Sequence, residues 1–175
     1  MADQASQTKS TTPIPRWAHV VAIFFGAGLG KPGPGTWGSA ATVLLWALIA
    51  HFTPAPYQLY VILILTAVSI VIGIPAATLE ARGCGRKDPS HVVIDEVAGQ
   101  LVTLIAAPVH FVPMLLGFLL FRAFDITKPP PIRRLEKLPE GTGIVVDDIG
   151  AGIYGWIVLQ VLLYLARQHG WNWMF

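Results

Sequence analysis

The chain has 175 residues, of which 54% are hydrophobic and 13% are charged, and its formal net charge is +2. This length fits one domain, and a mean hydropathy of +0.59 argues against an ordinary soluble protein, leaving an unusually apolar helical bundle as the soluble alternative. The lack of a basic stripe interleaved with aromatic residues argues against nucleic acid as a partner, and a single cysteine, Cys84, rules out an internal disulfide.

The N-terminal half predicts a polar tail followed by apolar helices. Residues 1–16 are polar, and no apolar stretch with a small-residue cleavage site follows them cleanly, so we expect a disordered tail rather than a signal peptide. Residues 17–29 are apolar but short and rich in glycine at their end, which favours an interfacial or re-entrant segment. Spans are predicted over residues 36–51 and 58–79, with a loop between them.

The next apolar stretch, residues 97–121, carries no charge and is long enough for one tilted helix. Pro108 and Pro113 fall in its middle, however, and proline disrupts a helix interior. We therefore expect a hairpin of two helices, over about residues 90–107 and 111–126.

A last span is predicted over residues 149–166. With the hairpin, nearly all lysine and arginine residues fall on one face of the membrane, as expected for cytoplasmic loops, and Arg167 is the exception. The sequence thus predicts an all-α, polytopic integral membrane bundle of about five helices with a short N-terminal segment. Residues 17–175 would form one membrane-embedded domain with its active face toward the cytoplasm.

This topology brings five carboxylates from three helices to one depth, where they would repel one another and raise one another's pKa values. A divalent cation would relieve the repulsion, and oxygen ligands favour Mg²⁺, with Mn²⁺ as a second choice. The alternative is that each acidic pair only stabilises a helix N-terminus. We expect catalytic roles for all five, and metal ligation by all except Asp147: Asp95, Glu96, Asp125, Asp147 and Asp148.

Basic and glycine-rich segments on the same face are candidates for binding phosphate. Arg122, Lys128 and Arg133 lie close to Asp125 in sequence, although a local ion pair or a lipid anchor would also explain them. The stretch from residue 26 to residue 39 is rich in glycine, and its Thr36 or Ser39 could cap the next helix while free backbone N–H groups bind phosphate. It could equally be a turn that enters the membrane.

Two smaller features remained open at this level. The Gly-Thr-Gly run at residues 141–143, before the aspartate pair, could help to bind phosphate or could be only a turn. His91 either contacts the acidic site or, more commonly for such a residue, occupies the start of a helix.

Four motifs, in order, resemble the phosphatidylglycerophosphatase A family: PGPGTWGS, VVIDEVAGQ, FRAFDITKPPPIRR and GTGIVVDDIGAG. The resemblance extends over about residues 17–166. It implies an all-helical, Mg²⁺-dependent enzyme of the bacterial inner membrane that removes the terminal phosphate of phosphatidylglycerophosphate to give phosphatidylglycerol. It also implies that the five carboxylates, Arg122 and Lys128 belong to the active site.

Rival functions make different demands on the sequence. A phosphatidyl-alcohol transferase should carry an Asp-x-x-Asp-Gly string, and the chain has none. A cation transporter or channel remains the alternative from another class, but it needs polar residues near the bilayer midplane. For the phosphatase, attack by water and attack by an aspartate both remain open.

Overall fold

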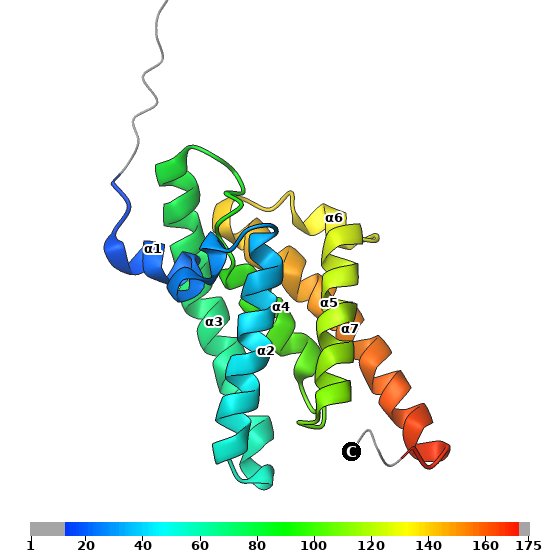
Figure 1. The fold of residues 1–175 in the computed structure, drawn as a ribbon. Helices are drawn as coiled ribbons and strands as arrows, with labels where there is room; N and C mark the ends of the chain where they lie inside the picture. Colours follow the sequence, from blue (N-terminus) through cyan, green and yellow to red (C-terminus); the bar gives the residue numbers. More distant parts are fainter. Residues whose placement is uncertain (1–12, 172–175) are drawn as a thin grey trace, which may run out of the picture.

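The computed structural model describes residues 13–171, which fold into eight helices joined by short connections (Figure 1). The first 12 residues, where the polar tail is predicted, lie outside the described part. In chain order the helices are α1 (Arg16–Ala22), the 3₁₀ helix η1 (Phe24–Leu29), α2 (Pro34–Phe52), α3 (Ala55–Cys84), α4 (Ile94–Leu104), α5 (Phe111–Thr127), α6 (Ile132–Leu135) and α7 (Glu140–Gln168).

The short helix α4 forms the centre of the bundle, and α2, α3, α5 and α7 pack around it. Nearly all of its residues are buried, including apolar ones such as Leu101 and Leu104 and polar ones such as Asp95 and Gln100. A helix that is buried on all sides has no face for solvent or lipid. The polar residues at its start are therefore held inside the protein.

The contact between α4 and α7 depends on glycine. A Cβ atom at Gly152 would collide with the backbone carbonyl of Gly99, and one at Gly99 would collide with the backbone of Asp148. Thr103 reinforces this contact, because its hydroxyl donates hydrogen bonds to the carbonyl oxygens of Gly99 (3.0 Å) and Gly152 (3.2 Å). Small residues thus let two backbones approach closely, as is common between membrane helices.

We expect the Gly152→Ala variant to lower the free energy of unfolding by ~2 kcal/mol, because the added methyl group would push α7 away from α4. The control is Gly150→Ala, two residues away in the same helix, whose methyl group would meet mainly the end of the Leu135 side chain. Thermal unfolding of both variants in detergent measures the difference. An unfolding midpoint for Gly152→Ala equal to that of the control would contradict this account of the packing.

Three of the helices are long and apolar enough to cross a membrane: α2 with 19 residues, α3 with 30 and α7 with 29. Large apolar side chains are exposed along all three, among them Leu44, Leu48, Ile64, Val71, Val161 and Tyr164. The predicted break near Pro108 is confirmed, since α4 ends at Leu104 and α5 begins at Phe111. However, α4 has only 11 residues and α5 has 17, so of the five expected spanning or near-spanning helices only α2, α3 and α7 are candidate spans among the described residues.

The predicted end of the second span and the predicted length of the loop before it are both wrong. The second span does not end at Leu79, because α3 continues through Pro75 as far as Cys84. The predicted loop at residues 51–57 shrinks to two residues between α2 and α3, and Pro56 is accommodated in the first turn of α3.

The Gly-Thr-Gly run is not a turn but part of α7, which begins at Glu140 rather than at Ile149. Its glycines serve packing, since a Cβ at Gly141 would collide with the backbone of Ile74 and Thr78 in α3. The aspartate pair consequently lies about two turns inside α7, where the helix-start explanation does not apply.

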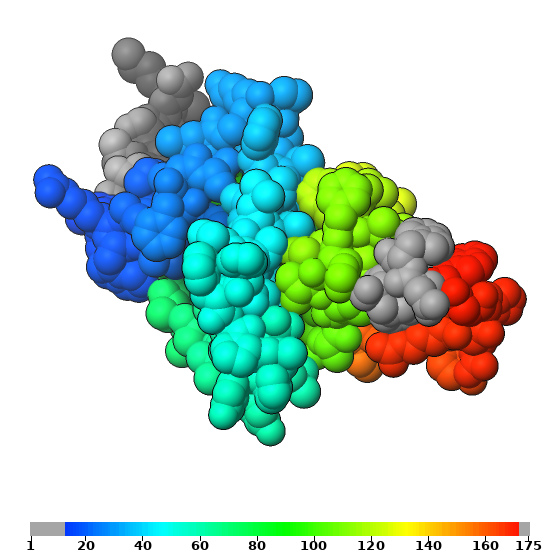
Figure 2. Space-filling view, turned by 60° about the horizontal axis from the view of Figure 1, so that its bottom comes forward, coloured from blue at the N-terminus to red at the C-terminus, as the bar shows by residue number. Residues whose placement is uncertain are grey.

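The N-terminal segment lies across the bundle rather than along it. In Figure 1, α1 runs crosswise to α2 and α3, and Ala18 and Ala22 are fully buried. The backbone N–H of Val93 donates a hydrogen bond to the carbonyl of Ala22 at 2.8 Å, so this segment contacts the chain just before α4. Figure 2 shows the opposite end, where the α2–α3 turn (cyan) and the last turns of α7 (red) project on either side of α5 (green).

Candidate active site

A polar cavity of about 260 Å³ lies at the end of the bundle where α2 and α4 begin and α5 ends. All five carboxylates singled out from the sequence line it, although they come from α4, α5 and the interior of α7. They are Asp95, Glu96, Asp125, Asp147 and Asp148. The cavity also contains Arg122 and Lys128, so side chains of both charge signs line it.

Three of these carboxylates form a group of their own. Asp95, Glu96 and Asp148 each offer an oxygen atom, and the three atoms lie within 4.8 Å of one another. Each of these side chains has one oxygen atom that is buried without a hydrogen-bond partner in the described part of the chain: Asp95 Oδ1, Glu96 Oε2 and Asp148 Oδ2. Burying oxygen atoms without hydrogen-bond partners costs free energy. A hard divalent cation coordinated by these three oxygen atoms would remove that cost.

The electrostatics of the group favour a cation as well. Burial, together with the neighbouring Glu96, raises the pKa of Asp95 well above its ordinary value. Burial likewise raises the pKa of Glu96 to about 8. Both pKa values are raised because negative charge is poorly solvated in the cavity, and a bound metal ion would neutralise that charge.

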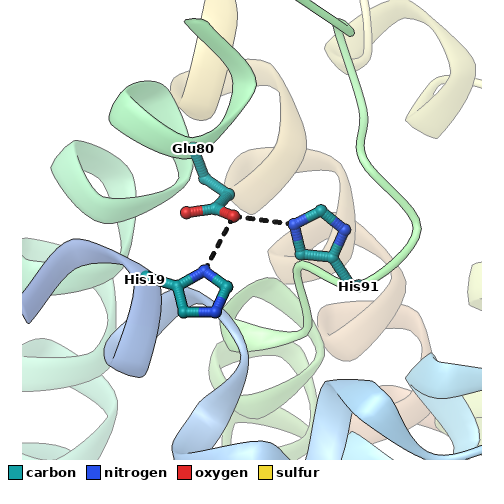
Figure 3. A group of neighbouring side chains, drawn as sticks. All are labelled: His19, Glu80 and His91. Atoms are coloured by element: carbon teal, nitrogen blue, oxygen red, sulfur yellow. Dashed lines mark hydrogen bonds and ion pairs between the residues drawn. The ribbon is translucent and has the colours of Figure 1, made fainter. Parts of the chain in front are cut away.

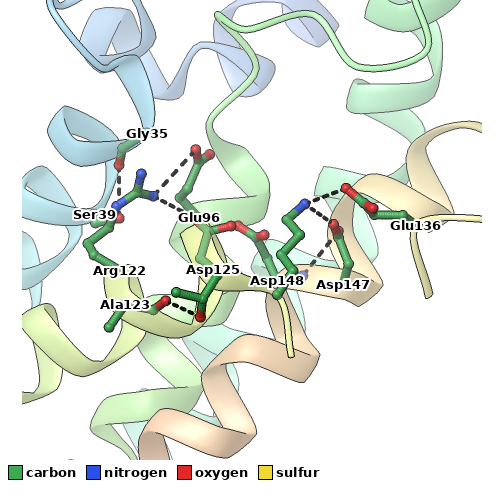
Figure 4. A network of polar contacts seen from close by, with 11 residues as sticks. Gly35, Ser39, Glu96, Arg122, Ala123, Asp125, Glu136, Asp147 and Asp148 are labelled. Carbon is green, nitrogen blue, oxygen red and sulfur yellow. Dashed lines mark hydrogen bonds and ion pairs between the residues drawn. The ribbon is translucent and has the colours of Figure 1, made fainter. Parts of the chain in front are cut away.

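Arg122 lies between two of the carboxylates (Figure 4). Its Nη1 atom is 2.7 Å from Asp125 Oδ2 and 3.8 Å from Glu96 Oε1. Asp125 therefore has a cationic partner, and it is not part of the three-carboxylate group that could hold a metal. The Nε atom of Arg122 is buried without a hydrogen-bond partner within residues 13–171, so the guanidinium keeps a donor for an anion.

Lys128 joins the other side of the cavity. Its Nζ atom donates hydrogen bonds to Asp147 Oδ2 at 2.6 Å and to Glu136 Oε1 at 2.8 Å (Figure 4). Burial lowers the pKa of Lys128, but these two hydrogen bonds outweigh that effect and raise its pKa overall. Asp147 is thus engaged with a lysine while its neighbour Asp148 belongs to the three-carboxylate group, a divergence expected because adjacent helical residues point about 100° apart.

The start of α2 forms one wall of the cavity through its backbone. Gly33, Pro34 and Gly35 line the cavity, whereas Thr36 and Ser39 are not among its lining residues. Thr36 is exposed, and the buried Ser39 donates its hydroxyl to the carbonyl of Gly35 at 2.8 Å. Neither residue caps α2, because the helix begins at Pro34 and both lie inside it.

Gly35 has a specific reason to be glycine. A Cβ atom at this position would collide with Glu96 Oε1 and lie 2.9 Å from Arg122 Nη1. A side chain at this position would therefore displace the carboxylate of Glu96 and the guanidinium of Arg122 from their observed positions. Only a general glycine-rich pattern was visible from the sequence here, with no indication of which glycine contacts the acidic residues.

The remaining candidates lie elsewhere. Arg133 is exposed in α6, and its guanidinium donates to the carbonyl of Thr127 at 3.4 Å rather than entering the cavity. His91 precedes α4 and contacts Glu80, not the acidic site. Two residues near the site were not predicted: Asp88, which lines the cavity, and Glu136, which accepts a hydrogen bond from Lys128. The available signal for Asp88 was its position only seven residues before Asp95 in the sequence.

The comparisons with known proteins agree with one another on family. A family model described as Phosphatidylglycerophosphatase A matches residues 20–163. The Haemophilus influenzae protein named Phosphatidylglycerophosphatase A is 38% identical over 148 residues, which cover 83% of this chain and 88% of the relative. The Escherichia coli protein of the same name is 37% identical over 166 residues, or 94% of this chain and 89% of the relative.

A third relative carries a different name. A Bacteroides thetaiotaomicron protein called "Putative phosphatidylinositol-3-phosphatase" is 34% identical over 140 residues, which cover 78% of this chain and 87% of the relative. No solved structure matches the chain significantly.

Proposed function

Because the chain belongs to the phosphatidylglycerophosphatase A family and is a lipid phosphatase, we propose that it hydrolyses phosphatidylglycerophosphate to phosphatidylglycerol and inorganic phosphate with Mg²⁺. The observation that carries the proposal is the group of three buried, unpartnered carboxylate oxygens beside Arg122 in one polar cavity. A phosphate monoester needs both a cation and hydrogen-bond donors. This cavity offers carboxylate ligands for a cation and the guanidinium of Arg122 as a hydrogen-bond donor.

The metal fits the residues that are present. Asp95, Glu96 and Asp148 would hold it, and Mn²⁺ suits the same oxygen ligands. When bound there, Mg²⁺ supplies positive charge that polarises the phosphate and offsets the charge that develops on it during hydrolysis.

The other residues of the cavity bind and orient the substrate. Arg122 donates a hydrogen bond to a phosphoryl oxygen through its Nε–H group, and Asp125 fixes the guanidinium in place through Nη1. Lys128 adds a second positive charge, held by Asp147 and Glu136. Water oriented by a cavity carboxylate attacks the phosphorus, and the alcohol of the lipid headgroup leaves.

The acyl chains of the substrate have an apolar path between α2 and α5. These two helices carry Gly35 and Arg122 at the cavity, and farther along they enclose a groove of about 680 Å³. Val43, Leu44, Met114, Leu115 and Phe118 are among its lining residues. We place the site at the cytoplasmic face of the bacterial inner membrane, because this orientation keeps most lysine and arginine residues inside.

The test is phosphate release by the full-length protein in detergent micelles that contain phosphatidylglycerophosphate. We expect rapid release with Mg²⁺, release with Mn²⁺, and no release when a chelator is in excess. Full activity in the presence of excess chelator would contradict the proposed requirement for a metal ion. Two comparison substrates test the lipid: equal efficiency on a soluble phosphate ester would reject a lipid substrate, and faster release from phosphatidylinositol 3-phosphate would replace the proposed headgroup.

A further inference from the structure

A second cluster of metal-ligating side chains lies away from the acidic cavity (Figure 3). His19 of α1, Glu80 of α3 and His91, just before α4, converge from three separate segments. Glu80 Oε1 is 3.0 Å from His19 Nδ1 and 2.7 Å from His91 Nε2. Neither histidine lines the acidic cavity, and neither has a role in the proposed hydrolysis.

Glu80 is an unusual residue in this position. Its side chain is only 1% exposed, and its second oxygen, Oε2, has no hydrogen-bond partner among the described residues. Its ion-pair partners are the two histidines, which carry charge only when protonated. A buried carboxylate that has no permanent positive partner among the described residues is costly, so a bound cation would stabilise the cluster.

The donor atoms match a transition metal. One atom from each of His19, Glu80 and His91 lies within 4.8 Å of the other two. A fourth donor is close, since Cys84 Sγ is 3.9 Å from Glu80 Oε1 and 4.0 Å from His91 Nε2. Two imidazoles, one carboxylate and one thiolate suit tetrahedral Zn²⁺, whereas Mg²⁺ prefers oxygen ligands alone.

We propose that His19, Glu80, His91 and Cys84 form a Zn²⁺ site that is separate from the acidic cavity. The half-exposed His19 and the exposed Cys84 leave the site open to ions from solution. The site ties α1 to the polar end of α3 and to the segment that leads into α4. That segment already bonds to α1 through Val93 and Ala22, so the ion would fix the approach to Asp95 and Glu96 without touching the substrate.

The experiment uses the full-length protein in detergent, freed of metal by chelation and exchange, with excess Mg²⁺ present to occupy the acidic cavity. Elemental analysis after addition of Zn²⁺ should give one zinc per chain. Co²⁺ serves as a spectroscopic probe, and it should show intense visible bands of tetrahedral coordination and a near-ultraviolet thiolate band, both of which Zn²⁺ abolishes by displacement.

Variants assign the ligands. His19→Ala, His91→Ala and Glu80→Gln should each weaken Zn²⁺ binding by about 100-fold or more, and Cys84→Ser should remove the thiolate band. The matched control is His110→Ala, which removes an exposed histidine outside the cluster and should bind Zn²⁺ as the wild type does. Asp148→Asn should also retain Zn²⁺, because it alters only the acidic cavity.

A thermal unfolding measurement gives an independent reading, since Zn²⁺ should raise the midpoint of the wild type by a few degrees but not that of His91→Ala. Failure of the wild type to take up Zn²⁺, or equal uptake by the His19→Ala and His91→Ala variants, would overturn the site. The cluster would then be a hydrogen-bonded triad. A wild-type Co²⁺ spectrum without a thiolate band would remove Cys84 as a ligand.

Discussion

The Asp148→Asn variant should lose phosphatase activity by about 10²- to 10³-fold, the scale of removing one charge-stabilising group from a reacting centre. The substitution keeps the shape of the side chain but removes a charge from the three-carboxylate group, in which Asp148 is only 3% exposed. The Mg²⁺ concentration that gives half-maximal activity should rise in parallel. Phosphate release in micelles, measured across a range of Mg²⁺ concentrations, gives both quantities.

The control for this prediction is Glu140→Gln, an equivalent substitution at the first residue of the same helix. Glu140 is exposed and pairs with Arg82, with N···O distances of 2.8 Å and 2.7 Å, outside the cavity. We expect its activity to stay within about twofold of the wild type, since exposed ion pairs contribute little. Wild-type activity in Asp148→Asn would show that the carboxylate group does not hold the catalytic metal.

The Gly35→Ala variant should also be severely impaired, by about 100-fold. The added methyl group would occupy the position of Glu96 Oε1 and crowd Arg122, so it would displace a proposed metal ligand and a proposed phosphate donor together. The control is Gly150→Ala, which adds the same methyl group to a helix where mainly the end of a leucine side chain must move. Activity at a fixed, saturating Mg²⁺ concentration is the measurement.

A double variant separates this cause from general misfolding. Glu96→Asp shortens the carboxylate side chain by one methylene, which leaves room for the methyl group of Gly35→Ala. If the collision is the cause, the two substitutions together should cost less than the product of their separate effects. Strictly multiplicative losses would indicate that Gly35 acts through something other than Glu96.

Much of the site could be predicted because charge is rare in this chain. With 13% charged residues, each carboxylate beside an apolar helix is conspicuous, and burying it demands a reason. Placing Asp95, Asp125 and Asp148 at one depth needed only the order of the apolar segments and the distribution of lysine and arginine. The family resemblance followed from the same four motifs, and the comparisons confirm it.

What could not be predicted depends on contacts between segments distant in sequence. Asp147 accepts a hydrogen bond from Lys128, whereas Asp148 belongs to the three-carboxylate group. Nothing local in the sequence reveals this difference, because it depends on where Lys128 lies. The role of Gly35 depends on side chains of α4 and α5, and the length of α7 depends on Gly141 packing against α3. Glu80 and His19 are 61 residues apart, so their contact likewise could not be predicted from the sequence.

The position of the aspartate pair inside α7 has a kinetic consequence. From Ile149 to the end of α7 about 20 residues remain, which is roughly 30 Å of helix and the thickness of the hydrocarbon layer. If this part of α7 spans the hydrocarbon layer, as we propose, the acidic cavity would lie at the plane of the lipid headgroups, and a substrate would reach it by lateral diffusion. The rate should follow the mole fraction of substrate in the surface, so diluting the lipid with inert detergent at constant bulk concentration should slow the enzyme.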